Sequence, residues 1–180
     1  MKRAPRYDLP KAAPGSLRLV QLFVNSSSHE TGLELLSTPA RASSWFAEQG
    51  FAVKVGTSQL LRVREVRSEL RAFVEGRQPG ECLAEVAANA RLTLDLGRPA
   101  LFPQAPGVEG ALGVILASVY DAIRDDTWSR LKTCRTCGWA FWDESRSRTA
   151  VWCSMQLCGN RAKVGRYRAR KRTEHQGETV

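Results

Sequence analysis

Four of the five cysteines lie in one C-terminal stretch as two short-spaced pairs. Two residues separate Cys134 from Cys137, four separate Cys153 from Cys158, and fifteen lie between the pairs. Structural zinc takes four ligands in a tetrahedron, and each short pair can wrap one turn around two corners of the metal. The spacing therefore predicts one structural Zn2+ per chain, held by four thiolates. Because such a shell has no open position for water, metal catalysis is not expected.

Two other uses of these thiols stay open at this point. An iron–sulfur cluster takes the same four thiolates, and paired cysteines form disulfides in oxidising compartments. The opening residues, MKRAPRYDLPKAAPG, are charged and Pro-rich without the apolar core of a secretion signal. We therefore expect a cytoplasmic protein with reduced thiols. Cys82 lies far upstream in an amphipathic segment, and we expect it to be a small buried hydrophobe.

The residues around the cysteines predict the elements that would position the metal. Gly138 follows the second thiol and allows the positive φ that a knuckle turn needs. The aromatic run at residues 139–143 predicts a strand, and residues 146–152 predict a returning strand, so that a hairpin covers the metal. A helix is expected from about Asn160, with Cys158 at or just before its first turn. This order is typical of a treble-clef or zinc-ribbon finger.

The same residues resemble the CGNR zinc finger, a family named for the tetrapeptide that here begins at Cys158. In that family the finger usually follows a mainly helical domain called ABATE, in bacterial proteins described as stress-induced transcriptional regulators or RNA-binding proteins. The resemblance therefore implies zinc and nucleic acid as partners. It is carried by the first cysteine pair, Phe141, Asp143, the Ser145-Arg146 turn, the segment from Trp152 to Met155, and Arg161-Ala162-Lys163.

The positive charge of the chain is concentrated in this region. Residues 1–127 hold 15 basic and 14 acidic residues, whereas residues 128–180 hold 12 basic and 4 acidic residues. A field gathered on one small module is the electrostatic footprint of a surface that binds a polyanion, because neutralising phosphates releases condensed counterions. A membrane surface is not favoured as that polyanion, because the basic helix lacks a broad apolar face.

Nucleic-acid contacts are expected from basic residues of the finger, and a solvated basic tail is the plain alternative. Val164 and Tyr167 form a narrow apolar stripe on the helix, which we expect to pack onto the hairpin aromatics. Arginine can pair with phosphate or with guanine, so residue type does not separate backbone contacts from base reading. The candidates are Arg146, Arg148, Arg161, Lys163, Arg166, Arg168, Arg170, Lys171 and Arg172.

The aromatic side chains of the finger have two readings. They could stack on unpaired bases, as in single-strand binders, or they could form the small core that a finger needs. We expect most of them to be buried. Strand alternation puts Trp139 and Phe141 on one face and leaves Trp142 as the side chain that we expect to be exposed.

The first two-thirds of the chain predicts a mainly α domain with a small β hairpin. Thr38 and Pro39 mark a helix start, as N-cap and first helical residue. Apolar residues at helical spacing predict helices over residues 59–75 and 108–125, the latter with Leu112, Ile115, Leu116, Val119 and Ile123 inward. Alternation around Gly97 predicts a hairpin over residues 91–103.

These patterns give a domain division and a second resemblance. We expect a flexible segment at 1–16, a mostly helical domain at 17–127, a small α+β zinc finger at 128–173 and a tail at 174–180. The run from Leu22 to Asn25 and the segment from Trp45 to Phe51 resemble the ABATE domain. One departure is Leu22, where many members carry an acidic residue, so any ligand contact by that acid is absent here.

Function follows from the finger rather than from the helical domain. No nucleophile motif, phosphate-binding glycine loop or paired carboxylate set stands out, so we do not expect an enzyme. The leading hypothesis is a DNA-binding transcriptional regulator whose helical domain senses a small-molecule effector or forms a homodimer. RNA binding is the first alternative. A module that docks an acidic protein partner is the alternative from another class.

Overall fold

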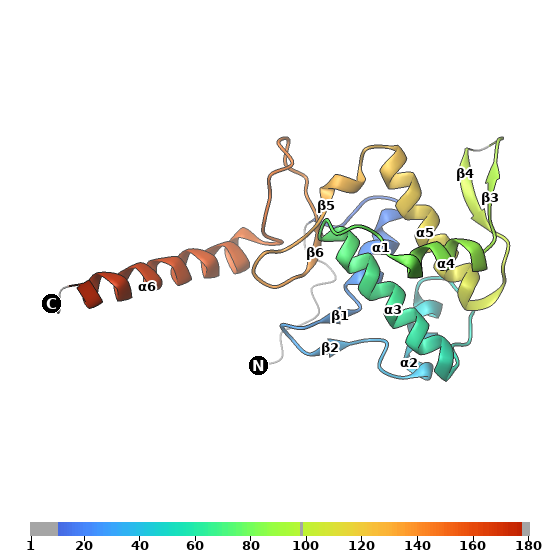
Figure 1. Cartoon of the computed structure of the whole chain (residues 1–180), viewed down its shortest axis with the longest axis horizontal. Coiled ribbons are helices and arrows are strands. Elements are labelled where there is room, and N and C mark those ends of the chain that lie inside the picture. The colour runs from blue at the N-terminus through green and yellow to red at the C-terminus, as the bar shows by residue number, and fades with distance from the viewer. Residues whose placement is uncertain (1–10, 98, 178–180) are drawn as a thin grey trace.

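A computed structural model of the chain describes residues 11–97 and 99–177, with the side chains of the last helix described up to Lys171. Figure 1 shows a helical body from which one long C-terminal helix extends. Five helices build the body: α1 (Leu17–Val24), α2 (Pro39–Glu48), α3 (Thr57–Val74), α4 (Glu81–Asn89) and α5 (Gly107–Arg124).

The described strands form three separate antiparallel hairpins. They pair β1 (Ser27–Ser28) with β2 (Leu33–Glu34), β3 (Leu92–Asp95) with β4 (Ala100–Pro103), and β5 (Leu131–Thr133) with β6 (Ala140–Trp142). A short 3-10 turn, η2 (Trp128–Arg130), leads into β5. A π turn, η3 (Met155–Gly159), leads into the extended helix α6 (Asn160–Gly177). A mostly helical N-terminal part and a cysteine-containing part with a hairpin and a helix confirm the predicted fold class.

The helix signals of the N-terminal part are confirmed. Thr38 caps α2, and its Oγ1 accepts a hydrogen bond from the backbone N–H of Arg41 at 3.2 Å. The segments predicted from helical spacing form α3 and α5, and the alternating segment forms the β3–β4 hairpin. Side chains from α1, α2, α3 and α5 meet in one apolar core. Its fully buried members include Phe23, Phe46, Leu70, Leu112 and Ile115.

Two residues of the helical part, Ile123 and Cys82, were predicted to be buried, and only Cys82 is. Ile123, expected to face inward, is 50% exposed, because the buried positions of the last turns of α5 are Val119 and Ala122. Cys82 is buried in α4 as expected, and burial is the main cause that raises the pKa of its thiol to about 11.

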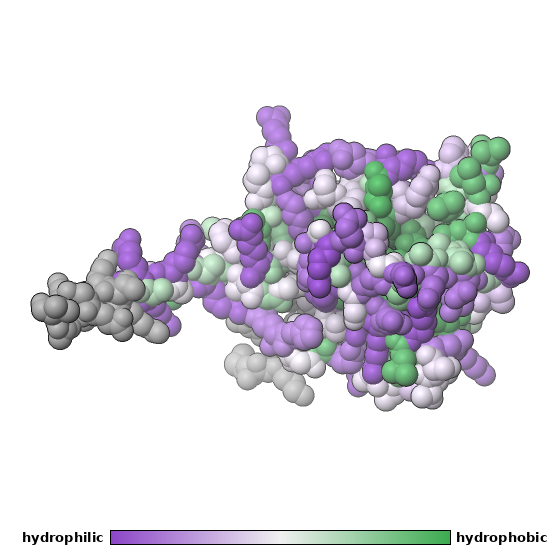
Figure 2. Space-filling model, viewed as in Figure 1, coloured by the Kyte–Doolittle hydropathy of each residue, from purple (hydrophilic) through white to green (hydrophobic). Residues whose placement is uncertain are grey.

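Apolar side chains are exposed at the end of the β3–β4 hairpin, where Leu96 is 83% exposed (Figure 2).

The hairpin of the finger does not form as predicted. The partner of β6 is β5, which precedes the first cysteine pair, and Leu131 lies opposite Trp142. Residues 146–152 form turns and loop instead of a returning strand. The reason is local: the backbone N–H of Ala150 donates to the carboxylate of Asp143 at 2.9 Å, so this segment bonds to a side chain rather than to a strand.

The ends of the chain add two observations. Residues 1–10 of the segment expected to be flexible lie outside the described residues. Residues 11–13 make specific contacts: Lys11 Nζ donates to the carbonyl of Trp152 at 2.8 Å, and the N–H of Trp142 donates to the carbonyl of Lys11 at 2.9 Å. Ala13 is buried. At the other end, α6 continues to Gly177, into the segment expected as a tail.

Candidate zinc centre and nucleic-acid interface

The four C-terminal cysteines converge, with all their sulfurs within 4.8 Å of one another. The Sγ atom of Cys137 lies 3.7 Å from that of Cys153 and 3.6 Å from that of Cys158, and Cys153 and Cys158 are 3.7 Å apart. A tetrahedral zinc site with zinc–sulfur bonds of about 2.3 Å puts its sulfurs about 3.8 Å apart. The cluster therefore fits one zinc ion. A multinuclear iron–sulfur cluster would hold its thiolates farther apart, and a disulfide would bring two sulfurs to about 2 Å.

A tight knuckle presents the first cysteine pair. The N–H of Gly138 donates to the carbonyl of Cys134 at 2.8 Å, and the N–H of Cys134 donates to the carbonyl of Trp139 at 2.9 Å. Gly138 has a φ of 68°, the left-handed conformation expected from its place after the second thiol. The N–H of Arg135 donates to the carbonyl of Val151 at 3.1 Å, which ties the knuckle to the segment before the second pair.

The second cysteine pair lies at the start of the helix rather than in a second knuckle, which favours the treble-clef alternative. The hydroxyl of Ser154 caps the π turn by accepting from the N–H of Leu157 at 3.2 Å. Cys158 is fully buried in this turn, directly before α6. An added Cβ at Gly159 would lie 2.5 Å from the sulfur of Met155, so a larger residue here would require the Met155 side chain to move.

The protonation of the cluster also favours a cation at its centre. Hydrogen bonds among the sulfurs lower the pKa of Cys134 and raise the pKa values of Cys137 and Cys153, so these thiols do not ionise together without a compensating charge. Four thiolates at these distances repel one another, so they can all ionise only around a positive charge. Arg161 adds charge outside the sulfur cluster, where its Nη2 donates to Cys158 Sγ at 3.6 Å.

Asp143 organises the loop that covers the cluster. Its carboxylate is fully buried and accepts from Lys132 Nζ at 2.8 Å, from the N–H of Ser145 at 2.9 Å and from the hydroxyl of Ser145 at 2.6 Å. Burial raises the pKa of this carboxyl, but the hydrogen bonds from Lys132, Ser145 and Ala150 outweigh burial and hold the pKa well below its usual range.

Three polar side chains of the helical body hold the finger in place. Asn25 is buried and clamps the backbone of Ala140 in β6: its Nδ2 donates to the carbonyl, and its Oδ1 accepts from the N–H, both at 2.8 Å. Gln21 Nε2 donates to the same carbonyl at 3.1 Å. Arg71 Nη1 in α3 donates to the carbonyl of Gly138 at 2.6 Å.

The sequence did not indicate that Asn25, Gln21 and Arg71 would contact the finger. Asn25 stood out only through the ABATE resemblance, and Arg71 read as one of several charges on the polar face of a helix. The partners of these side chains lie 115 and 67 positions along the chain, so no local pattern could identify them.

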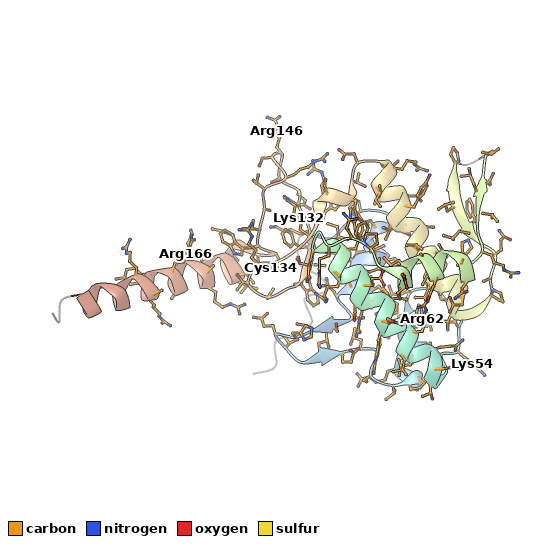
Figure 3. All side chains as sticks on the ribbon, in the orientation of Figure 1. Lys54, Arg62, Lys132, Cys134, Arg146 and Arg166 are labelled. Carbon is orange, nitrogen blue, oxygen red and sulfur yellow. The ribbon has the colours of Figure 1, made fainter. Side chains whose placement is uncertain are left out.

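The basic residues predicted to contact nucleic acid do not all lie on one surface. Arg148 pairs with Asp126 and Arg161 pairs with Glu30, so these two arginines face other parts of the protein. Arg146 is exposed in the loop after Asp143, away from Arg166 on α6 (Figure 3). The side chain of Arg172 lies outside the described residues. Arg161 is itself 40% exposed, and the other exposed basic side chains described on α6 are Lys163, Arg166, Arg168, Arg170 and Lys171.

The apolar stripe of α6 does not pack onto the hairpin, contrary to our expectation. Val164 is 47% exposed and Tyr167 is 53% exposed, because α6 leaves the body after its first turn (Figure 1). The hairpin aromatics form a core without it. Trp139 and Phe141 are buried among the cysteines, as expected, whereas Trp142 is half-buried against the main core rather than exposed.

A knuckle, a hairpin and a helix around four thiols place the chain among zinc-finger proteins. Two family models match it: the CGNR zinc finger over residues 130–171, and ABATE, described as "Putative stress-induced transcription regulator", over residues 17–126. The chain belongs to the ABATE family and carries a CGNR zinc finger after the ABATE domain. A search of curated proteins finds no match.

These matches agree with the site. A family of transcription regulators implies a nucleic-acid partner, and neither family model describes an enzyme. Among the helices in the described part of the chain, none has the length and apolar character needed to cross a membrane.

Proposed function

We propose that this chain is a DNA-binding transcriptional regulator that presents α6 to the major groove. The observation that carries the proposal is the row of exposed basic side chains on a helix that packs against η3 at its base and then extends into solvent (Figures 1 and 3). An 18-residue helix is about 27 Å long, and the major groove admits one helix.

The charge and the exposed apolar residues of α6 support the same proposal. The excess positive charge lies in residues 128–180, where binding to phosphates would release counterions. Val164 and Tyr167 have no core to bury them, and they are placed to contact thymine methyl groups or sugars once the helix enters a groove. The arginines beside them can contact phosphate or guanine.

Zinc has a structural role in this proposal. Cys134, Cys137, Cys153 and Cys158 would fill its four positions, so the ion would fix the knuckle to the base of α6 and would have no site for a reactive water. The zinc centre would therefore have no catalytic role, and the chain would act as a regulator rather than as an enzyme. The helical domain would sense an effector or form a homodimer, and the protein would act in the cytoplasm.

DNA is favoured over RNA by the placement of the aromatic residues of the hairpin, which leaves Tyr167 on α6 as an exposed ring on which a base could stack. Binding to unpaired bases needs exposed aromatic faces, but Trp139 is 9% exposed and Phe141 is 1% exposed. Half-buried Trp142 packs against the helical body. The described part of the hairpin therefore offers no stacking platform.

The test is a titration of the zinc-loaded full chain with duplex DNA and with single-stranded RNA, followed by fluorescence anisotropy at several salt concentrations. Replacing Arg166 and Arg168 together by alanine should weaken duplex binding and reduce its salt slope by about 2, because each lost phosphate contact removes about one unit. The matched control replaces Arg41 and Lys54 by alanine. Both are exposed on the helical body, and Lys54 lies far from α6 (Figure 3).

The outcomes separate the alternatives. Equal affinity for duplex DNA in the two double variants would show that α6 is not part of the interface. A preference for RNA would support the first alternative. Binding to neither nucleic acid, together with an acidic protein that co-purifies after nuclease treatment, would support the protein-docking alternative and overturn the proposal.

A further inference from the structure

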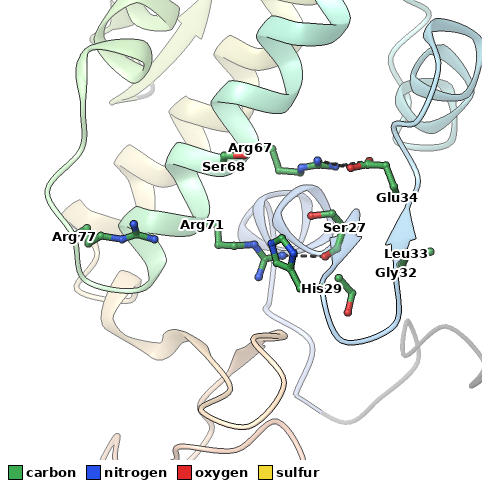
Figure 4. Close-up of a pocket in the computed structure, with 10 residues that line it drawn as sticks. Ser27, His29, Gly32, Leu33, Glu34, Arg67, Ser68, Arg71 and Arg77 are labelled. Carbon is green, nitrogen blue, oxygen red and sulfur yellow. Dashed lines mark hydrogen bonds and ion pairs between the residues drawn. The ribbon is translucent and has the colours of Figure 1, made fainter.

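A hollow of about 520 Å³ lies between the β1–β2 hairpin and the C-terminal half of α3 (Figure 4). Ser27, His29 and Glu34 line it from the hairpin side, and Arg67 and Arg71 reach into it from α3. A second hollow of about 440 Å³ shares Ser27, His29 and Arg71 and extends to the zinc knuckle at Cys137 and Gly138. Volumes of a few hundred Å³ are typical of sites for small molecules.

The polar groups of the first hollow carry an excess of positive charge. Three arginines, Arg67, Arg71 and Arg77, face one carboxylate, Glu34. Arg67 neutralises the charge of that carboxylate with two parallel hydrogen bonds, Nη1 to Oε1 at 2.7 Å and Nη2 to Oε2 at 2.6 Å. Arg77, at the rim, pairs with Glu75 at 2.5 Å, and its side chain is 67% exposed.

Arg71 is the charge without a compensating ion pair. Its guanidinium donates to three main-chain carbonyls, those of Gly138 at 2.6 Å, Val24 at 2.6 Å and Ser27 at 3.0 Å. In the described part of the chain, no carboxylate forms a salt bridge with it. Burial lowers its pKa, and the nearby Glu75 opposes that effect only in part. An anion would find here a partly desolvated cation, where a charge-assisted hydrogen bond is strong.

We propose that this hollow binds a small molecule that carries a carboxylate or phosphate oxyanion. Arg71 is the anchor, and Arg77, which also pairs with Glu75, is a second cation at the rim. The hydroxyl of Ser27 and the ring of His29 supply further hydrogen-bonding groups around the anion. Carboxylate and phosphate share the chemistry that a guanidinium recognises, two oxygens presented side by side.

Occupancy of the hollow would act on the finger. Arg71 holds the knuckle at Gly138 and the hairpin at Ser27, so an anion competes with both carbonyls for one guanidinium. The same hairpin carries Glu30, which pairs with Arg161 in the first turn of α6. The ligand would thus change how the knuckle and the base of α6 rest on the body. This coupling rests on the proposed function, whereas binding in the hollow does not.

Binding is tested by calorimetric titration of the zinc-loaded full chain with inorganic phosphate and, separately, with succinate, at an ionic strength held constant with sodium chloride. At least one probe should bind saturably. Arg77→Gln should weaken that binding about tenfold, the usual effect of losing a hydrogen bond to a charged group. Arg41→Gln, which removes an exposed charge outside the hollow, should bind as the parent does.

Arg71→Lys gives a second test because lysine keeps the charge but loses the planar fork. It should also weaken binding while the zinc content stays at the level of the parent. If Arg71→Lys does not fold, Arg77→Gln still decides. A response to phosphate alone or to succinate alone supports the site and identifies the oxyanion. Absence of saturable binding, or equal binding by the parent and Arg77→Gln, overturns it.

Coupling is tested by repeating the duplex titration with and without the bound probe at equal ionic strength. The parent should change affinity about fivefold, and Arg77→Gln should change less. An unchanged affinity in the parent, with probe binding intact, would overturn the coupling alone. If Arg77→Gln weakened duplex binding while neither probe bound, the hollow would belong to the nucleic-acid surface, and the small-molecule inference would be wrong.

Discussion

Single side chains set the geometry of the finger, and Asp143 is the clearest case. Its buried carboxylate accepts hydrogen bonds from Lys132, Ser145 and Ala150, and these bonds hold the segment that was predicted to pair as a returning strand. Its folded pKa lies below the ordinary value of 3.8, so its contribution to stability is complete above that pH and is lost as the pH falls toward the folded pKa.

Asp143→Asn should destabilise the zinc-loaded protein by about 2 to 4 kcal/mol, because a buried partner of Lys132 loses its charge and one oxygen acceptor. Urea unfolding measures the difference. It should be constant between about pH 6 and 8, since the carboxyl stays ionised throughout that range. Asp126→Asn is the control: this side chain is 81% exposed, and its ion pair with Arg148 is worth at most about 1 kcal/mol.

Cys158→Ser should weaken zinc binding about 100-fold, because one ligand in four carries roughly 3 kcal/mol of the binding free energy of a structural site. Elemental analysis after dialysis against a chelator measures the loss. Cys82→Ser should keep the zinc content of the parent, since Cys82 is buried in α4, away from the cluster. Loss of zinc from both variants would show that unfolding, and not ligation, decides the result.

At the residue scale, spacing was enough to find the cysteines but not to find which arginines form ion pairs with other parts of the protein. Two short pairs and a following glycine predicted a set whose four sulfurs do converge. Arg148 and Arg161 belong to the same basic run by composition, yet they pair with Asp126 and Glu30. Their partners are 22 and 131 positions away, and only the folded chain brings them together.

At the element scale, periodicity was reliable where a helix has one buried face. The helices α3 and α5 formed where their apolar spacing predicted them. We predicted the wrong partner strand for β6, because residues 131–133 and residues 146–152 both resemble strands. Hydrogen bonds to the carboxylate of Asp143 hold residues 146–152 as a loop, so residues 131–133 pair with β6. The helix α6 was predicted correctly as a helix, but its narrow stripe did not predict that it would be left without a packing partner.

Gly165→Ala should strengthen α6 by about 1 kcal/mol, because glycine is a poor helix former and an added Cβ would meet nothing within 4 Å. Far-UV circular dichroism should show more helix at unchanged zinc content, and duplex binding should be equal or tighter. Gly138→Ala is the contrasting variant. Its φ of 68° disfavours alanine, so the same substitution should destabilise the knuckle. Equal helix content in the parent and Gly165→Ala would mean that α6 is already fully formed.

At the scale of the whole molecule, the β5–β6 hairpin of the zinc finger packs into the core of the helical body, whereas the cysteines, Trp139 and Phe141 form a second cluster. Leu131 in β5 and Ala140 in β6 are buried in the same apolar cluster as Phe23 and Phe46 of the helical body. The charge and composition of the sequence change abruptly near residue 128, which suggests a boundary but says nothing about how closely the two parts pack. The polar clamp at Asn25 joins them through backbone groups, which leave no trace in side-chain patterns.

The two parts should therefore unfold together, and Asn25→Ala tests this. The substitution leaves the buried N–H of Ala140 without its acceptor, at a cost of about 2 to 4 kcal/mol, or roughly 5 to 10 °C in Tm. Calorimetry of the zinc-loaded parent should show one transition whose calorimetric and van't Hoff enthalpies agree, and that transition should move as a whole in the variant. Asn89→Ala, at an exposed position of α4, should leave Tm nearly unchanged. Two transitions in the parent, of which only one responds to Asn25→Ala, would mean that the finger folds apart from the body, and that any signal from the helical domain must reach α6 without a shared folded unit.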